Sequence, residues 1–317
     1  MSETVISAPA KAQDCRVAWS ETLTDLAGRD ERIVAVVNDS LGSSKLDGFA
    51  KAFPDRTVNV GIAEQLMVGV GAGLANGGKV PFVSAAGCFL TGRALEQIKA
   101  DVAYSGYNVK LVGQSSGVAY GELGATHHSI EDLGWLRQLG QITVIVPADS
   151  WETAEAVRWA AEHDGPVYLR ISRMKVPDLE IANRSFRPGR AEVVRDGSDA
   201  AILACGTCVH LARDAAELLQ AEGVSVRVLN VATINPLDED ALAKAAATGA
   251  IVTVEEAHVR GGLGGAVAEW TASHHPCRVT RMGFDGFRTT GSAERLFEDA
   301  GLTAEGIAAQ VRATLSA

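Results

Sequence analysis

Short apolar runs alternate with amphipathic segments along the first half of the chain. Residues 150–162 lie between two of these runs and have a helical pattern, with Asp149 or Ser150 as N-cap. Continuous apolar strands separated by helices predict a mainly parallel sheet that helices cover on both faces. The predicted strands are 33–38 (IVAVVN), 80–84 (VPFVS), 109–115 (VKLVGQS), 143–147 (TVIVP) and 166–172 (PVYLRIS).

The alternation stops at a polar segment and then starts again. Residues 174–190 (MKVPDLEIANRSFRPGR) carry two prolines and no periodicity, which is typical of a linker. We therefore expect an α/β protein of two tandem domains, 12–176 and 191–317, with a linker over 177–190. The apolar runs of the second domain are 200–205, 225–230, 251–256 and 278–284.

The stretch from Leu66 to Leu90 is apolar enough to suggest a membrane span. Polar and turn-forming residues at 76–79 and Pro81 interrupt it, so it is interpreted as a buried helix, a turn and a buried strand. Its GVGAG sequence (69–73) resembles a nucleotide-binding loop, but it lies inside the predicted helix. We therefore expect no membrane association.

Charge and cysteine content narrow the class of protein further. The formal net charge is −10 and no basic run exceeds two residues, which argues against a nucleic-acid groove. Small phosphorylated ligands stay possible, because one or two arginines suffice to bind them. Five cysteines and no secretory signal in MSETVISAPAKAQD indicate reduced thiols in a cytoplasmic protein. The pair Cys205 and Cys208 is better explained by a strand-to-helix turn than by redox chemistry or zinc.

Glu64 is the one carboxylate in the apolar stretch VNVGIAEQLMVGVG (58–71), and Lys79 is the only charge between it and Arg93. Spacing alone slightly favours a carboxylate at a helix N-terminus, where the helix dipole stabilises it. The alternative is an acid that hydrogen-bonds a heterocyclic nitrogen in a dry site, where burial raises its pKa. Thiamine diphosphate requires such a group, because proton sharing with its pyrimidine promotes the imino tautomer that deprotonates the thiazolium.

Two other motifs are candidates for ligand binding. The Gly-rich segment GELGATHHSIEDLGWLR (121–137) carries two adjacent histidines, whose side chains diverge and so argue against a two-histidine metal site. Loops at strand ends in α/β sheets bind ligands, which favours a function for it. Arg170 and Arg173, in RISR, are equally consistent with a phosphate clamp or with charge at the end of a sheet.

In this order, the motifs resemble the C-terminal half of transketolase, from about Arg16 to the end of the chain. The resemblance implies a pyrimidine-binding domain followed by a transketolase C-terminal domain. It also implies ketol transfer from a ketose phosphate to an aldose. The motifs are VGIAEQ, GCFLTGRALEQI, GATHHSIEDL, VPADSWE, PVYLRISR and VEEAHVRGGLGGAVAE.

The resemblance implies two catalytic residues and an aromatic wall. Glu64 stands at the position of the glutamate that contacts the aminopyrimidine of thiamine diphosphate, with Gln65 beside it. Phe89 matches an aromatic residue that stacks on that ring, and a flat apolar face suits a flat heterocycle. His127 matches a histidine that handles hydroxyl groups and the carbonyl near the thiazolium.

The same resemblance implies substrate-binding residues. Arg173, with Arg16 and Ser44, matches positions that bind the substrate phosphate. Leu123 and His128 lie in the loop that selects the sugar. Transketolases typically have an acidic residue where Leu123 stands, and leucine cannot accept a hydrogen bond from a substrate hydroxyl. The resemblance therefore leaves the sugar open and is compatible with an unusual or branched sugar phosphate.

Transketolases bind the diphosphate and Mg²⁺ through a Gly-Asp-Gly segment that is missing from this sequence. The nearest match, RDGSD (195–199), lies in the wrong domain. The oxygen ligands of Mg²⁺ are therefore expected on another chain, with no metal ligands in this one. The resemblance implies one half of a split transketolase. It would be inactive alone and would form a two-plus-two heterotetramer with an N-terminal-type subunit.

Three alternatives stay open. The β subunit of a 2-oxoacid dehydrogenase E1 component has similar length and a matching glutamate, but HHSIEDLGWLR and RISR favour transketolase. A deoxyxylulose-phosphate synthase normally carries both cofactor domains in one chain. A non-catalytic regulatory subunit would have no use for Glu64, Phe89 and His127.

Overall fold

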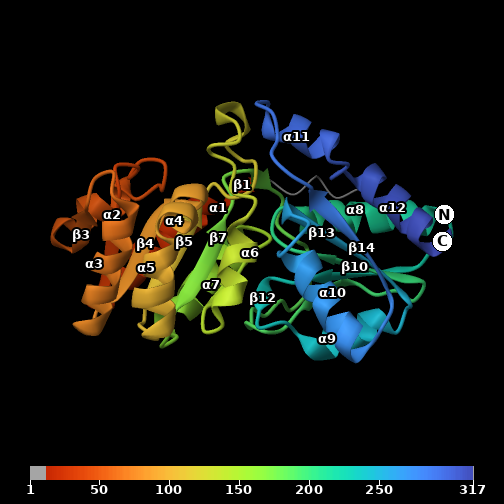
Figure 1. Ribbon diagram of the computed structural model, residues 1–317, viewed down its shortest axis with the longest axis horizontal. Coiled ribbons are helices and arrows are strands. Elements are labelled where there is room, and N and C mark those ends of the chain that lie inside the picture. The colour runs from red at the N-terminus through yellow and green to blue at the C-terminus, as the bar shows by residue number, and fades with distance from the viewer. Residues whose placement is uncertain (1–11, 317) are drawn as a thin grey trace.

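A seven-stranded sheet forms the centre of the first domain in the computed structural model, which describes residues 12–316 (Figure 1). Its strand order is β12-β6-β7-β5-β4-β2-β3, and all neighbours are parallel except β12 and β6. The first eleven residues, on which the expectation of no secretory signal rests, lie outside the described residues. The strands are β2 (Ile33–Val37), β3 (Thr57–Asn59), β4 (Val80–Ala86), β5 (Lys110–Gln114), β6 (Thr143–Ile145), β7 (Val167–Ile171) and β12 (Thr233–Asn235).

Both faces of this sheet are buried, which explains why its strands are continuously apolar. Along β2, Val34 and Val36 join one hydrophobic cluster, and Ile33 and Val37 join another. One face is covered by α1 (Cys15–Ala27), α2 (Asp47–Ala52) and α7 (Ser150–Glu162). The other is covered by α3 (Glu64–Asn76), α4 (Gly87–Arg93), α5 (Leu95–Gln97), the π-helical η2 (Ile98–Tyr104) and α6 (Asp132–Leu136). Single turns of 3₁₀ helix are η1 (Pro54–Arg56), η3 (Gly121–Leu123) and η4 (Arg137–Leu139).

The second domain has a five-stranded sheet with the order β14-β13-β10-β11-β9, in which only β9 is antiparallel. The predicted α/β class with two mainly parallel sheets is therefore confirmed. Its strands are β9 (Glu192–Arg195), β10 (Ala200–Ala204), β11 (Val226–Asn230), β13 (Ala250–His258) and β14 (Arg278–Phe284). Its helices are α8 (Cys208–Ala221), α9 (Glu239–Ala246), α10 (Leu263–His274), α11 (Ala293–Asp299) and α12 (Ala304–Ser316).

Several local predictions are confirmed. Helix α7 begins at Ser150, and the Asp149 side chain accepts a hydrogen bond from the backbone N–H of Glu152 at 2.8 Å. The apolar stretch after Glu64 forms α3, a turn and β4. Cys205 and Cys208 lie at the turn from β10 to α8, and all five thiols are free. Within residues 12–316, none of the helices combines the length and apolarity needed to cross a membrane.

The two halves are joined more closely than the tandem pattern suggests. Strand β12 belongs to the second half of the chain but pairs with β6 in the first sheet. The segment interpreted as a linker contributes Arg184, whose guanidinium contacts the buried Asp149 carboxylate at 2.5 Å. Just before that segment, β8 (Lys175–Val176) pairs with β1 (Gln13–Asp14). The β12–β6 pair and the contacts of Arg184 with Asp149 and Glu192 join the first domain to the second.

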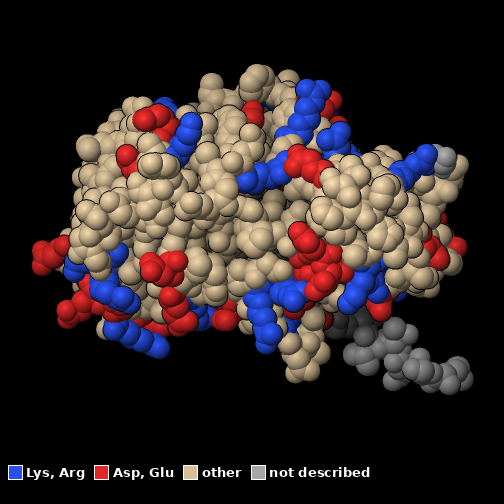
Figure 2. Space-filling view, turned by 60° about the horizontal axis from the view of Figure 1, so that its bottom comes forward, with Lys and Arg blue, Asp and Glu red and all other residues tan. Residues whose placement is uncertain are grey.

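Acidic and basic side chains are interspersed on the surface. On the face shown in Figure 2, Lys and Arg lie among Asp and Glu without forming a continuous basic stripe. This distribution agrees with the net charge of −10 and with the absence of basic runs in the sequence.

Candidate active site

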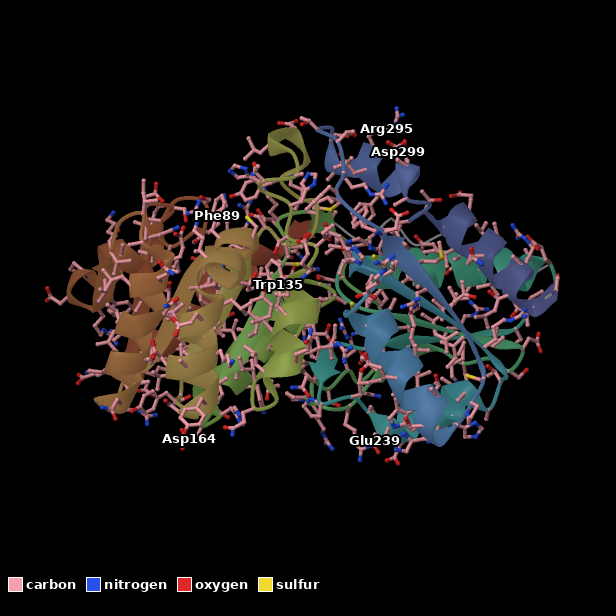
Figure 3. All side chains as sticks on the ribbon, viewed as in Figure 1. Phe89, Trp135, Asp164, Glu239, Arg295 and Asp299 are labelled. Atoms are coloured by element: carbon pink, nitrogen blue, oxygen red, sulfur yellow. The ribbon has the colours of Figure 1, made fainter. Side chains whose placement is uncertain are left out.

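The candidate site lies where the carboxyl ends of the parallel strands meet, which is the edge at which α/β sheets bind ligands. Asn38 follows β2, Glu64 follows β3, Phe89 follows β4 and His127 lies in the loop after β5. Figure 3 shows Phe89 at this end of the first domain and Asp164 at the opposite end. Sheet topology thus brings together residues that are far apart in the sequence.

Glu64 is the first residue of α3 and is only 3% exposed. Its carboxylate accepts hydrogen bonds from Asn38 Nδ2 at 3.1 Å and from Arg93 Nη1 at 3.0 Å. Burial alone would raise the pKa of Glu64. The hydrogen bonds from Arg93, from its own backbone N–H and from Asn38 outweigh burial and hold the pKa below its ordinary value. The predicted burial is confirmed, but the raised pKa is wrong for the single chain, because Arg93 pairs with the acid.

An aromatic cluster adjoins this acid. The Arg93 guanidinium lies 4.2 Å from the centroid of the Phe89 ring, and the Phe89 and His127 rings meet edge to face at 5.1 Å. His127 Nδ1 is 3.0 Å from the hydroxyl of Thr126. Arg93 therefore links Glu64 to the Phe89 ring, and Phe89 in turn contacts His127.

Glu64 opens onto a pocket of about 590 Å³. Gln65 is exposed there, and so are Ile62 and Leu66, which are 75% and 56% exposed. A buried acid beside an aromatic ring, with apolar side chains at the rim, fits the aminopyrimidine half of thiamine diphosphate. In residues 12–316, three or more His, Cys, Asp or Glu side chains nowhere gather into a set that would hold a metal ion.

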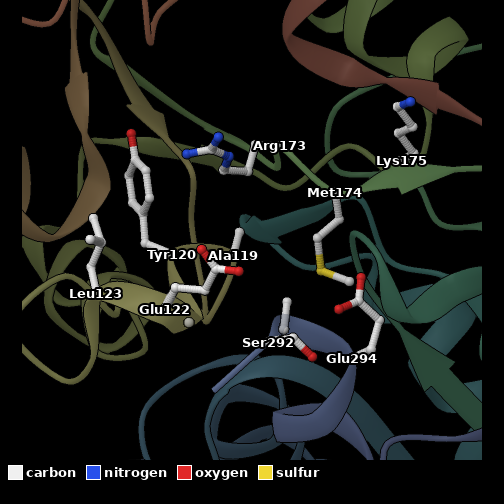
Figure 4. Close-up of a pocket in the computed structure, with 11 residues that line it drawn as sticks. Ala119, Tyr120, Glu122, Leu123, Arg173, Met174, Lys175, Ser292 and Glu294 are labelled. Atoms are coloured by element: carbon white, nitrogen blue, oxygen red, sulfur yellow. The ribbon is translucent and has the colours of Figure 1, made fainter. Parts of the chain in front are cut away.

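A second pocket, of about 570 Å³, lies between the two domains. Arg173 and Leu123 line it from the first domain, and Glu294 lines it from the second (Figure 4). The Arg173 guanidinium lies 4.6 Å from the centroid of the Tyr120 ring, and Leu123 is 53% exposed. The pocket is lined by the Arg173 guanidinium, which lies over the Tyr120 ring, and by the apolar side chain of Leu123.

The two adjacent histidines diverge, as predicted. His127 is half-buried against Phe89, whereas His128 is 4% exposed and neither of its ring nitrogens has a hydrogen-bond partner. Burial lowers the pKa of His128, which favours a neutral imidazole. His128 therefore lies behind the loop surface, and His127 is the one that faces the aromatic cluster.

Arg16 and Ser44 lie near each other, but neither lines the pocket of Arg173. Arg16 is buried, pairs with the Asp14 carboxylate at 2.6 Å and donates to the carbonyl of Ser43 at 3.0 Å. The Ser44 hydroxyl is 3.3 Å from that of Ser84. In the single chain both side chains hold the loop after β2.

Arg170 does not take part in a two-arginine phosphate clamp, so that alternative is wrong. Its side chain is buried, and Nε donates to the Asp132 carboxylate at 2.8 Å. Nη2 donates to the carbonyls of Ser129 and Glu256 at 2.8 and 2.9 Å. Arg170 is a structural cation between the domains. Of the two arginines of RISR, only Arg173 lines the pocket.

Sequence reasoning missed two residues that touch Glu64. Asn38 is the last residue of the first predicted strand, and a polar residue at the end of a strand is the sequence signal that could have identified it. In the sequence, Arg93 is marked only by being the second charged residue after Glu64. Nothing in a spacing of 29 residues shows that the two side chains meet.

Comparisons with known proteins agree with this architecture. The profile described as "Transketolase, pyrimidine binding domain" matches residues 11–178, and "Transketolase, C-terminal domain" matches 189–307. The chain is 44% identical to an apulose-4-phosphate transketolase subunit of Phocaeicola vulgatus, over 92% of this chain and 95% of that protein. It is 40% identical to the 6-deoxy-6-sulfo-D-fructose transketolase subunit SqwH of a Clostridium species, over 92% and 91%.

Among solved structures, one described as a split gene transketolase, inactive beta4 tetramer, superposes with a TM-score of 0.87. It is 40% identical, and the match covers 96% of this chain and 99% of that one. The two profiles, the relatives and this structure share one pair of domains in one order. The chain therefore belongs to the transketolase family, with the pyrimidine-binding and C-terminal domains that split transketolase subunits carry.

Proposed function

We propose that the chain is the pyrimidine-binding subunit of a thiamine-diphosphate-dependent transketolase that transfers a two-carbon ketol unit from a ketose phosphate to an aldose. The observation that carries this proposal is the buried Glu64, which lies beside Phe89 and His127 at the carboxyl edge of the parallel sheet. A buried acid next to an aromatic ring and a histidine is a catalytic arrangement, whereas a scaffold would gain stability from an apolar residue at position 64.

Each residue would have a separate task. Thiamine diphosphate, when bound, supplies the carbon nucleophile of the reaction. Glu64 would share a proton with the pyrimidine nitrogen, and Phe89 would hold the ring flat. His127, whose ring meets those of Phe89 and Tyr120 edge to face, would donate a hydrogen bond to the oxygen on which charge develops. Arg173 would bind the phosphate, as a guanidinium binds such an anion with two parallel hydrogen bonds.

The cofactor site requires a second chain. The exposed Ile62 and Leu66 border the Glu64 pocket and would be covered by an N-terminal-type subunit that binds the diphosphate and Mg²⁺. We infer a two-plus-two heterotetramer. The homologous structure described as an inactive beta4 tetramer supports the expectation that this chain has no activity alone.

One assay tests this proposal. The chain is mixed with the N-terminal-type transketolase subunit of the same organism, thiamine diphosphate and Mg²⁺, and ketol transfer from a ketose phosphate is measured. Activity that requires both subunits supports the proposal. Turnover by the chain alone with thiamine diphosphate and Mg²⁺ contradicts it.

The same mixture separates the alternatives. Decarboxylation of pyruvate with transfer to a lipoyl domain would indicate the β subunit of a 2-oxoacid dehydrogenase. Condensation of pyruvate with glyceraldehyde 3-phosphate would indicate a deoxyxylulose-phosphate-synthase-like enzyme. We favour a sugar-phosphate enzyme over the 2-oxoacid dehydrogenase because Arg173 and Leu123 line one pocket of about 570 Å³, and a reaction that passes an acyl group to a lipoyl domain needs no phosphate-binding arginine.

Arg173→Met is expected to raise the KM for a phosphorylated acceptor about 10–100-fold with a smaller change in kcat. The estimate follows from about 1.5–3 kcal/mol for hydrogen bonds to a charged group. The same acceptor without its phosphate is the control, and its KM should stay within about twofold, since the lost contact is to phosphate only. Equal losses for both acceptors would show that Arg173 does not bind the phosphate.

Leu123→Asp is expected to raise the preference for an aldose phosphate over its 2-deoxy analogue by about 10–100-fold, because a carboxylate accepts a hydrogen bond from the hydroxyl. Leu123 is 53% exposed, so the fold should not change. Leu218→Asp, at a 40% exposed position on α8, is the matched control. An unaltered ratio of kcat/KM values would mean that position 123 does not read the substrate.

A further inference from the structure

Arg93 makes two contacts that the proposed function assigns to the cofactor. Its Nη1 donates to Glu64 Oε2 at 3.0 Å, and its guanidinium lies 4.2 Å from the centroid of the Phe89 ring. A planar nitrogen-bearing group thus hydrogen-bonds the acid and lies against the aromatic ring at the same time. An aminopyrimidine held by Glu64 and Phe89 would do the same.

Two planar groups cannot occupy one place. Glu64 Oε1 already accepts a hydrogen bond from Asn38 Nδ2 at 3.1 Å. Glu64 Oε2 is paired with Arg93, and Arg93 is one of the residues that line the pocket together with Glu64. A ring that is to reach both Oε2 and Phe89 therefore meets the guanidinium first.

We propose that Arg93 occupies the aminopyrimidine site in the single chain and leaves it when thiamine diphosphate binds in the assembled enzyme. This inference rests on the proposed function and adds a residue that sets how tightly the cofactor is held. Arg93 is a positioning residue, because it acts through Glu64 and Phe89.

Displacement of Arg93 is physically feasible. The side chain of Arg93 is 50% exposed, whereas that of Glu64 is 3% exposed, so the cation can turn into solvent while the acid stays in place. Phe89 is half-buried, and the attraction of a half-exposed guanidinium to such a ring is weak. Solvation recovered by the charged group offsets part of the lost ion pair.

The departure of Arg93 would also prepare Glu64 for catalysis. Burial raises the pKa of Glu64, and the hydrogen bond from Arg93 is the largest of the effects that lower it. Without that hydrogen bond the pKa of Glu64 rises, which favours a proton shared with a ring nitrogen. Arrival of the ring would thus remove the group that keeps the acid ionised.

The test is the Kd of thiamine diphosphate for the complete enzyme, measured by fluorescence titration with the partner subunit and saturating Mg²⁺. Arg93→Ala is expected to lower the Kd about 5–10-fold, as it would if Arg93 filled the site in some 80–90% of molecules. Arg93→Lys keeps the charge but cannot lie flat on the ring, so it should give an intermediate Kd. Arg158→Ala is the matched control, because Arg158 is 48% exposed and forms one ion pair, with Glu155 on α7.

The results of the titration distinguish a failure of the role given to Arg93 from a failure of the proposed function. An unchanged or higher Kd for Arg93→Ala, with normal binding by the wild-type enzyme, would overturn the role of Arg93 and leave the proposed function intact. Failure of the wild-type enzyme to bind thiamine diphosphate would instead overturn the proposed function. A structure of the loaded enzyme with the guanidinium still against Phe89 would also contradict the inference.

A measurement on the single chain checks the ion pair without any cofactor. The carboxyl ¹³C signal of Glu64 is titrated by NMR in the wild-type chain and in the Arg93→Ala and Arg158→Ala variants. The pKa of Glu64 should rise in Arg93→Ala and stay unchanged in Arg158→Ala. An unchanged pKa in both would show that Arg93 does not rest on Glu64 in solution.

Discussion

Glu64→Gln should lower kcat for ketol transfer by about 10²–10⁴-fold, the range over which a positioned acid or base contributes to catalysis. Glutamine has nearly the size of glutamate and keeps one oxygen that can accept from Asn38 or Arg93. It cannot exchange a proton with the ring of the cofactor. Packing and assembly should therefore survive while the proton transfer is lost.

The measurement is a coupled ketol-transfer assay on the reconstituted enzyme, with sedimentation velocity to confirm that the subunits assemble. Glu96→Gln makes the same chemical change at an exposed position on α5 and should leave kcat within about twofold, as surface changes usually do. A Glu64→Gln enzyme that assembles and turns over at a near-normal rate would remove the role of Glu64 in activating the cofactor.

Most of the strands were predictable because both faces of each sheet are buried. β2, β4, β5 and β7 lie within the predicted apolar runs or overlap them, and the runs overlap β10, β11, β13 and β14 in the second domain. Two of the missed strands have little apolar signal. β3 is three residues long, with two residues half-buried and one exposed, and β9 has one residue exposed and the others half-buried. An apolar pattern reports burial, so it does not detect strands at the edges of sheets.

The candidate site was predictable only in part. The isolated acid in an apolar run identified Glu64, and the motif order identified Phe89, His127 and Arg173. Pairing of Arg93 with Glu64 depends on how α4 packs beside α3, which is a tertiary feature. The expected direction of the pKa shift at Glu64 was therefore wrong, since it used burial without the partner cation.

A similar limit applies to Arg170. As a residue of a buried strand next to Arg173 it was a plausible phosphate ligand, and only the structure reveals its partners. Tyr168 and Arg170 are two residues apart on β7, so both point to the same face, where Asp132 on α6 receives them. The Tyr168 hydroxyl donates to Asp132 Oδ2 at 2.7 Å, and Arg170 Nε donates to the same atom.

These contacts connect the stability of the fold with the loop that carries the two adjacent histidines. Arg170 donates to the carbonyl of Ser129, which ends the histidine loop, and to that of Glu256 on β13 of the second domain. The carboxylate of Glu256 in turn accepts from the backbone N–H of Val118 at 2.9 Å. Arg170 thus holds the Ser129 end of the loop that carries Leu123 and His127, and the Glu256 carboxylate holds the Val118 end, so both ends are tied to the C-terminal domain.

Asp132→Asn is expected to lower the free energy of unfolding by about 3–5 kcal/mol, because it leaves the guanidinium of Arg170 buried without its counter-ion. Both side chains of the pair are at most 3% exposed, so water cannot replace the lost charge. Urea unfolding followed by circular dichroism measures the effect. The exposed pair of Arg29 and Asp25 is the control, and Arg29→Met should cost less than about 1 kcal/mol.

The double variant Asp132→Leu with Arg170→Met separates charge from packing. Replacing a buried ion pair by apolar residues of similar volume is often close to neutral, so this variant should be more stable than Asp132→Asn. Its loop would nevertheless lose the hydrogen bonds from Arg170 to Ser129 and Glu256, and KM for the sugar should rise although the fold is kept. If Asp132→Asn unfolds at the wild-type urea concentration, the ion pair does not stabilise the fold. If the double variant keeps the wild-type KM, Arg170 has no part in positioning the loop.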